Sequence, residues 1–314
     1  MTIALWIVVL LAGAGAIVWG AEAFAEHLGG AAKRLGVSSF ALALLLAGAE
    51  PEELATAVAA ALRGSPGIAL GDVIGANVTI CLVALGLGAL IRPLPFQDAF
   101  RYAVFGLPLG VIVVIIAWDG TVSRGEGMLL VLLYVGYVAT IWVLERRPPA
   151  LGEVAELAES PTRNIGTTAR RDLFFVLAGI AAMSIGASVL VEAARRITTA
   201  EALQTKLGLT IVGFATGFEL VVLAWSASRR GASEAVVAGV VGSFSYNVTM
   251  TLGAAALTRP LVFHDALILH QPLLLMIAAF GAVLLLTVRR RKLSRSAGFI
   301  LLLGYPIFIF LVIR

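Results

Sequence analysis

The sequence predicts an all-α integral membrane protein whose ten transmembrane helices form two inverted five-helix repeats. Three observations predict this fold class. First, 60% of the 314 residues are hydrophobic and only 13% are charged, whereas about a quarter of a soluble domain is charged. Second, apolar runs of roughly 18 residues or more, long enough to cross the hydrocarbon core, recur along the whole chain. Third, a segment of the first half is repeated in the second half.

Ten apolar runs are expected to be the membrane-spanning helices. Strand-like alternation is absent, and only helices or closed barrels satisfy their backbone hydrogen bonds in lipid. The first run lacks a basic leader, so we expect it to stay in the protein as a membrane span. The expected spans are 2–24, 36–62, 67–91, 102–118, 127–144, 173–192, 207–228, 235–257, 266–288 and 296–313.

The basic residues between the spans predict how the chain is oriented. If the N-terminus lies outside, the inward loops carry sixteen Lys and Arg residues and the outward segments carry seven. Because basic residues concentrate on the cytoplasmic side, both termini are predicted to lie outside. The net charge of +4 therefore needs no nucleic-acid partner. The single cysteine, Cys81, excludes a disulfide within the chain.

The two halves of the chain are copies of one unit. Shifted by 167 positions, residues 48–99 align with 215–266 without a gap, and 17 of the 52 pairs are identical. "ALIRPLPFQDA" in the first half matches "ALTRPLVFHDA" in the second. Because five spans is an odd number, the second copy must enter the membrane from the opposite side, as in many transporters. The expected divisions are a first repeat at 1–144, a cytoplasmic linker at 145–171 and a second repeat at 172–314.

Buried polar residues cluster in the two repeated segments, 48–80 and 215–247. An ionised carboxylate at the bilayer centre costs about 2.5–3.5 kcal/mol, so several acids need compensating partners. No Lys or Arg lies at matching depth, which leaves protons or metal cations. Carboxylate, amide and hydroxyl oxygens suit Ca²⁺, Na⁺ or protons. The candidate ion-binding residues are Glu50, Glu52, Glu53, Asp72, Asn77, Thr216, Glu219, Ser243 and Asn247.

Pro51 and two glycines predict a local opening of the helices at these acids. Pro51 removes a backbone donor, and Gly48 and Gly217 make unwinding easier. On a continuous helix Glu52 would point roughly 100° away from Glu53, so the acids could not all face one ion. Two other interpretations stay open: the acids could be protonated structural groups, and the asparagines could join helices. No HExxH motif favours an intramembrane metalloprotease.

The two repeated segments resemble the alpha-repeats of the sodium/calcium exchanger branch of the cation/Ca²⁺ antiporter superfamily. "GAEPEEL" followed by "RG" and "ALGDVIGAN" resembles the pattern G-T-S-x-P-E-L, K/R-G and A-L-G-N-x-I-G-S-N. "ATGFEL" followed by "VVGSFSYN" resembles the second repeat. The resemblance implies two long gate helices packed against an eight-helix core, with cation sites formed by both repeats.

The resemblance also implies roles for individual residues. Glu53 takes the place of the motif Glu and Asp72 that of an Asn, while Asn77 matches the Asn of the G-S-N pattern. In the second repeat, Thr216, Ser243 and Asn247 match polar positions of the motif.

The departures from the motif leave two questions open. Glu50 replaces the motif Ser, and Glu52 stands at the usual Pro position. Glu219 also falls on that Pro position, unless a gap of one residue restores it to the motif Glu. Either Glu52 or Glu53 is then the ligand in the first repeat.

These residues predict a secondary antiporter rather than an enzyme, without a resident cofactor. It is expected to exchange Na⁺ for Ca²⁺ or another divalent cation by alternating access, with Glu53, Glu219, Asp72 and Glu50 as the direct ligands. The alternative is proton-coupled exchange of H⁺ for Ca²⁺ or for Na⁺, which the surplus acids favour. Its partners would be these cations and the lipid bilayer. The short linker resembles that of prokaryotic members, which predicts the cytoplasmic membrane, and the oligomeric state is not predicted.

Overall fold

The computed structural model describes residues 3–35, 50–97, 99–145, 169–230 and 233–314. Within these residues the chain is helical apart from four two-residue strands at helix connections. Nine described helical segments are long and apolar enough to cross a membrane, which agrees with the predicted all-α membrane class. The remaining predicted span, 36–62, lies partly outside the described residues. Its second part forms α3 (Pro51–Leu62).

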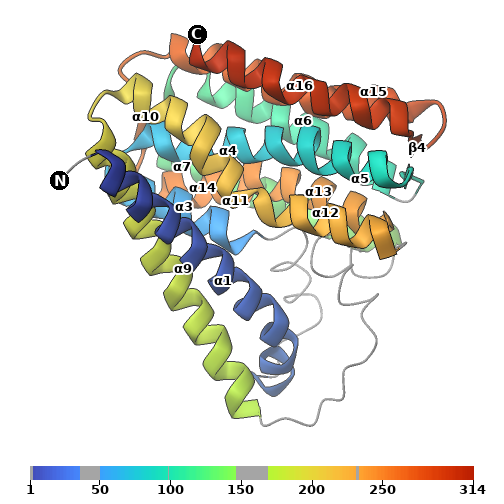
Figure 1. Ribbon diagram of the computed structural model, residues 1–314, viewed down its shortest axis with the longest axis horizontal. Helices are drawn as coiled ribbons and strands as arrows, with labels where there is room; N and C mark the ends of the chain where they lie inside the picture. Colours follow the sequence, from blue (N-terminus) through green and yellow to red (C-terminus); the bar gives the residue numbers. More distant parts are fainter. Residues whose placement is uncertain (1–2, 36–49, 98, 146–168, 231–232) are drawn as a thin grey trace.

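The first half of the described chain contains one long helix followed by several shorter elements (Figure 1). These are α1 (Ile3–Leu35), α3, α4 (Pro66–Thr79), the π-helical segment η1 (Ile80–Ala84), α5 (Leu85–Ile91), β1 (Leu94–Pro95), α6 (Ala99–Ala117), β2 (Thr121–Val122) and α7 (Arg124–Glu145).

The second half repeats this order. Its elements are α9 (Ala169–Ile197), α10 (Glu201–Leu207), η2 (Gly208–Val212), α11 (Gly213–Thr216), α12 (Phe218–Arg230), α13 (Ser233–Tyr246), η3 (Asn247–Thr251), α14 (Leu252–Thr258), β3 (Leu261–Val262), α15 (Leu267–Val288), β4 (Lys292–Leu293) and α16 (Arg295–Ile313). Adding 167 to the residue numbers of η1, α5 and β1 gives those of η3, α14 and β3. The sequence repeat is therefore also a repeat of secondary structure.

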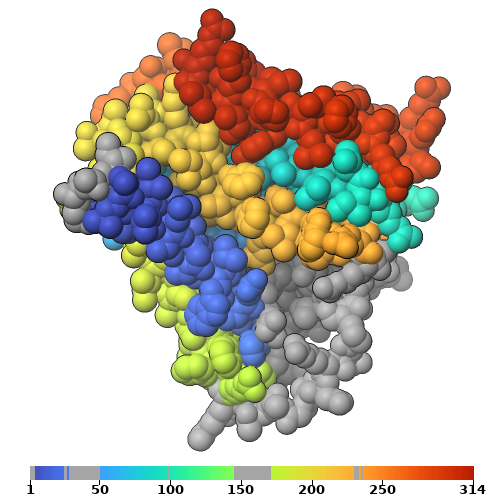
Figure 2. Space-filling view, in the orientation of Figure 1, coloured from blue at the N-terminus to red at the C-terminus, as the bar shows by residue number. Residues whose placement is uncertain are grey.

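α1 and α9 lie side by side and cross the other helices at an angle (Figure 1). They approach closely through glycines: a Cβ atom on Gly20 would lie 2.7 Å from the carbonyl oxygen of Gly179, and one on Gly13 would lie 2.9 Å from that of Gly186. Small residues at such crossings let two membrane helices pack backbone to backbone. Gly20 lies against Gly179 and Gly13 lies against Gly186, so the two helices are antiparallel. α1 forms part of the molecular surface seen in Figure 2.

Four short strands join the two halves at their helix connections. β1 pairs with β4 and β2 pairs with β3, both antiparallel. Each ribbon therefore contains one strand from each half. A two-residue strand is too short to produce an alternating pattern, so the sequence does not predict these ribbons.

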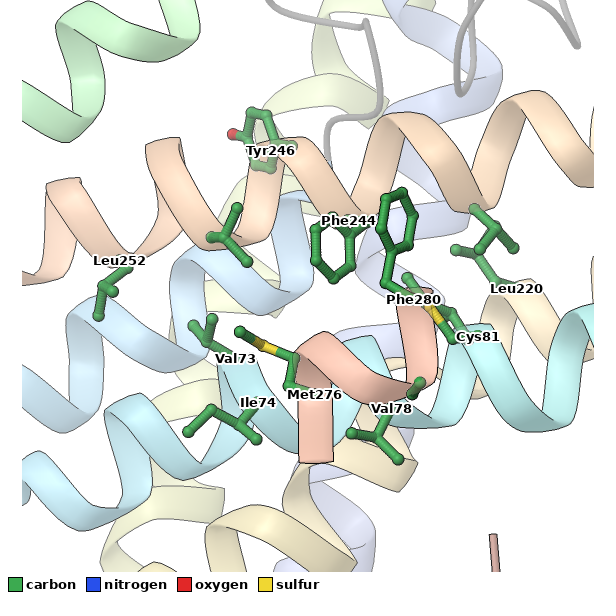
Figure 3. Close-up of a cluster of buried hydrophobic side chains, with 14 of the residues drawn as sticks. Val73, Ile74, Val78, Cys81, Leu220, Phe244, Tyr246, Leu252, Met276 and Phe280 are labelled. Atoms are coloured by element: carbon green, nitrogen blue, oxygen red, sulfur yellow. The ribbon is translucent and has the colours of Figure 1, made fainter. Parts of the chain in front are cut away.

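The helices that carry the repeated motifs lie at the centre of the molecule. The segments Pro66–Ile91 and Val236–Thr258 are the two most buried candidate spans. In Figure 3, Phe244 of α13 stacks on Phe280 of α15, with ring centroids 3.8 Å apart. A Cβ atom on Gly110 of α6 would lie 3.0 Å from the Phe244 ring, so α13 is packed between α6 and α15.

Two features of the predicted spans differ from the structure. The span expected at 207–228 is not one continuous helix, because it begins at Glu201 and is interrupted at Gly217, between α11 and α12. α1 and α9 extend beyond the expected ranges 2–24 and 173–192. A helix can continue past the hydrocarbon core with polar residues, whereas an apolar run marks only the part within lipid.

Candidate ion-binding site

Two helices begin inside the protein with acidic residues in their first turns. α3 begins at Pro51, whose missing N–H is tolerated at the first helical position. Glu52 and Glu53 lie in the first turn of α3, and Glu219 lies in the first turn of α12, directly after the interruption at Gly217. The first turn of a helix has free N–H groups and a positive dipole end, which favour carboxylates. Gly48, also expected to help open the helix, lies outside the described residues.

The backbone at Glu50 removes the geometric conflict among the first-repeat acids. Glu50 precedes α3 and has φ −115° and ψ 85°, which is not helical. Its side chain is therefore not fixed to the helical spacing that separates Glu52 from Glu53. The carboxyl group of Glu50 interacts with those of Glu52, Glu53 and Glu219.

Glu53 lies where the two repeats meet. Its carboxyl group interacts with Asp72 and Glu52 from its own repeat, and with the Asn247 amide and Glu219 from the other. Asp72 lies in α4, and its Oδ1 accepts a hydrogen bond of 2.8 Å from the Thr216 hydroxyl.

In the second repeat, Asn247 also contacts Ser243. The Asn247 Nδ2 donates to the Ser243 hydroxyl at 3.3 Å, and both side chains are fully buried. These contacts bring together eight of the nine predicted residues: Glu50, Glu52, Glu53, Asp72, Thr216, Glu219, Ser243 and Asn247.

Three acids of the first repeat are buried without a basic ion-pair partner in the described part of the chain. Glu52 is 1% exposed, and Glu53 and Asp72 are fully buried. Both carboxylate oxygens of Glu52 and of Glu53, and the Oδ2 of Asp72, have no hydrogen-bond partner among the described residues. The ion pairs within the described ranges lie elsewhere, at Glu192 and Glu201. Because a buried charge needs a partner, this arrangement can hold protons or cations.

Asn77, the ninth predicted residue, makes different contacts. Its Nδ2 donates to the Val73 carbonyl oxygen at 2.9 Å and lies 3.9 Å from the Met276 sulfur. Its Oδ1 is buried without a hydrogen-bond partner among the described residues. Ion binding by Asn77 stays a prediction. The sequence does not indicate Met276 as a neighbour, because α15 carries no motif that links it to α4.

In the described part of the chain, the acids do not form a complete metal centre by themselves. Within the ranges that the structure describes, no group of three or more His, Cys, Asp and Glu side chains is arranged to hold a metal ion by itself. Ca²⁺ also accepts hydroxyl, amide and main-chain carbonyl oxygens. The Thr216 hydroxyl and the Asn247 amide lie beside the acids, so the polar groups at this site are mixed.

The fold and this site define a class: a multi-span membrane protein with an acidic centre buried between two repeated halves. The chain belongs to the sodium/calcium exchanger protein family, whose sequence model matches residues 5–143 and 172–314. This confirms the family that the motifs of the two repeats predicted. It is a family of transporters.

Individual relatives agree with this assignment. The chain is 26% identical over 342 residues to the sodium/calcium exchanger MaX1 of Methanosarcina acetivorans, and the alignment covers 96% of each chain. It is 25% identical over 311 residues to the uncharacterized membrane protein MJ0091 of Methanocaldococcus jannaschii, covering 96% of this chain and 94% of the other. A structure of the sodium-calcium exchanger NCX_Mj soaked with Na⁺ and Sr²⁺ has the same fold, with a TM-score of 0.62 and 22% identity over 98% of this chain and 99% of that chain.

Proposed function

We propose that this protein is a secondary active antiporter that exchanges Na⁺ for Ca²⁺ or another divalent cation by alternating access. Glu53, Glu219, Asp72 and Glu50 are the direct ligands, and Glu52, Asn77, Thr216, Ser243 and Asn247 complete the site. One observation carries the proposal: the oxygens of Glu52 and Glu53 are buried without a hydrogen bond that meets normal geometry in the described chain, while the charge of Glu53 interacts with groups of both repeats. Membership of the exchanger family and the name of MaX1 support the choice of ions.

The complete architecture in this proposal is ten helices in two inverted repeats, 1–144 and 172–314, joined by a cytoplasmic linker at 145–171. The antiparallel packing of α1 on α9 supports inversion, because these helices open the two repeats. The family match is itself divided between residues 143 and 172. Most of the linker lies outside the described residues.

Alternating access requires one part of the protein to move relative to another. α1 and α9 are the natural moving pair, because they lie at an angle to the remaining helices (Figure 1). Movement of this pair would open the site alternately to the two sides of the cytoplasmic membrane. The distribution of basic residues supports a position of both termini outside.

The direct test is transport by the purified protein in vesicles. Proteoliposomes loaded with Na⁺ and diluted into Na⁺-free buffer with radiolabelled Ca²⁺ are expected to take up Ca²⁺. Vesicles with equal Na⁺ on both sides, and empty liposomes, are the controls. Absence of uptake above these controls would refute Na⁺/Ca²⁺ exchange.

Proton-coupled exchange is the second candidate, on the same fold. The observation that favours it is the number of acids: one divalent cation cannot neutralise Glu50, Glu52, Glu53, Asp72 and Glu219 if all are ionised. Ca²⁺ uptake driven by a pH gradient without Na⁺ would support this candidate. The same pH gradient should have no effect if the acids are neutralised by metal cations alone.

A further inference from the structure

A second polar region lies far from the acidic centre, at the C-terminal end of α9. A cavity of about 730 Å³ is located there, between this helix, the turn that joins α3 to α4, and the start of α10. Its polar lining includes Ser65, Glu192, Arg195, Arg196 and Glu201. The candidate span of α9 ends here, and the next candidate span begins here with α10. The cavity therefore lies at a membrane boundary.

The cavity and the groove that adjoins it together carry more arginines than carboxylates in the described chain. Glu192 is paired with Arg63 at 2.8 Å and with Arg196 at 2.7 Å, and Glu201 is paired with His264 at 2.7 Å. Arg195 lines the same cavity, and its charge also acts on Glu192, although no hydrogen bond or ion pair within 4 Å joins the two in the described chain. Arg63 lines the groove that adjoins the cavity, so the cavity and groove together contain three arginines and two carboxylates, which favours an anionic ligand.

A buried hydroxyl group at the start of α4 also favours an anionic ligand. Ser65 precedes α4, a helix of 14 residues, and its side chain makes no capping hydrogen bond. Its Oγ is buried without a hydrogen-bond partner in the described part of the chain, and the residue is 1% exposed. A hydroxyl at a helix N-terminus, where the dipole is positive, is a suitable donor to a phosphate oxygen.

An apolar groove adjoins the cavity along the outer side of α1 and α9. It has a volume of about 540 Å³ and shares Glu192 with the cavity. Trp6, Val9, Ile185 and Val189 supply its apolar surface. The Arg196 guanidinium lies 5.8 Å from the centre of the Trp6 ring, an arrangement typical of the membrane interface. In Figure 1 the start of α1 and the end of α9 lie at the same end of the molecule.

We infer that this two-part cleft binds an anionic phospholipid of the surrounding bilayer. The phosphate lies against Arg195 and Ser65, and one acyl chain follows the apolar groove beside Trp6 and Ile185. A free phosphate ion would use the cavity but not the groove, whereas the two regions together match an amphipathic ligand. Such a lipid would contact both α9 and the α3–α4 turn, and so would join the long helix pair to the rest of the protein.

Lipid retention by the intact purified protein tests this inference without any transport measurement. Native mass spectrometry compares retention of phosphatidylglycerol with that of phosphatidylcholine after exchange into mixed micelles. We expect the wild type to retain phosphatidylglycerol preferentially. Arg195→Gln is expected to lower this retention roughly five-fold, because one basic residue near an anionic lipid is worth about that much. Glu192 keeps its ion pairs with Arg63 and Arg196 in this variant, so the variant should fold normally.

Two further variants and one competitor make the test specific. Arg124→Gln removes an equal charge from an exposed position at the start of α7 and should leave lipid retention unchanged. Ile185→Trp fills the apolar groove and should also reduce retention, whereas added inorganic phosphate should not displace the lipid. Equal retention by wild type, Arg195→Gln and Arg124→Gln would overturn the inference. So would full displacement by inorganic phosphate, which would indicate a simple anion site.

Discussion

Glu52 and Glu53 are adjacent in the chain, but their carboxyl groups have different neighbours. Glu53 interacts with the acids Asp72 of its own repeat and Glu219 of the other, and also with the neutral Asn247 amide of the second repeat. Glu52 interacts with Glu50, Glu53, Asp72 and Glu219, and all four are acids. Of the two, Glu53 therefore has the better surroundings for a cation that must be held by mixed oxygen ligands.

Replacing each acid separately distinguishes these roles. Glu53→Gln is expected to weaken Ca²⁺ binding by at least about tenfold, since even residues that only support a ligand are worth 10–100-fold in metal affinity. Glu52→Gln should weaken binding less, because the other acids around Glu52 remain in the variant. Calorimetric titration of the purified protein measures both. Glu22→Gln, an exposed acid of α1, is the control, and a larger effect of Glu52→Gln than of Glu53→Gln would reverse the assignment.

Thr216 is the described hydrogen-bond donor to Asp72, which predicts a supporting role. Thr216→Val keeps the side-chain shape but removes the 2.8 Å hydrogen bond to Asp72 Oδ1. Leaving a buried acceptor unsatisfied costs about 1–3 kcal/mol, so we expect weaker Ca²⁺ binding and a lower melting temperature. Thr210→Val is the matched control, because Thr210 donates only to the main-chain oxygen of Lys206. Equal effects of the two substitutions would show that the Asp72 contact has no special importance.

At the scale of elements, the crossing of α1 and α9 depends on glycines at defined positions. A Cβ atom on Gly20 would lie 2.7 Å from the Gly179 oxygen and 2.9 Å from the Met183 nitrogen, which are backbone atoms that cannot turn away. Gly20→Ala is therefore expected to force the helices apart and to destabilise the protein by about 1–3 kcal/mol.

Gly15 provides the control for this prediction on the same helix. An added Cβ atom there meets no atom within 4 Å, so Gly15→Ala should be neutral or slightly stabilising, because Ala is the better helix former. Thermal unfolding in detergent micelles compares the two variants with the wild type. A loss of stability in Gly15→Ala as large as that in Gly20→Ala would contradict this account of the crossing.

Local rules predicted some of these elements and could not predict others. The start of α3 follows from Pro51, and the apolar runs indicated where the described spans lie. The π-helical segments η1, η2 and η3 have no residue pattern of their own, so the sequence indicated continuous helices there. The acids were identified because charges in an apolar run are conspicuous. Their contacts were not predicted, since Glu53 and Asn247 are far apart in the chain and meet only through packing of the two repeats.

At the scale of the whole molecule, the strand ribbons agree with an alternating path through the membrane. β1 pairs with β4, and β2 pairs with β3. With the N-terminus outside and ten spans, the connections that contain β1 and β4 both fall inside, and those that contain β2 and β3 both fall outside. Each ribbon then joins two loops on one side of the membrane, as strand pairing requires.

Thiol labelling tests this orientation without depending on transport. Cys81 is the single cysteine of the sequence and is fully buried, so an introduced surface thiol should be the main reactive group. The two positions chosen for cysteine are Ser123, beside β2, and Ser296, near β4, and both are exposed. Ser123 directly precedes α7, and Ser296 lies in the first turn of α16. In intact cells, a membrane-impermeant maleimide is expected to label Ser123→Cys and to label Ser296→Cys only after the membrane is opened. The reverse pattern would place both termini inside, whereas labelling of both variants in intact cells would contradict the proposed ten-span path itself.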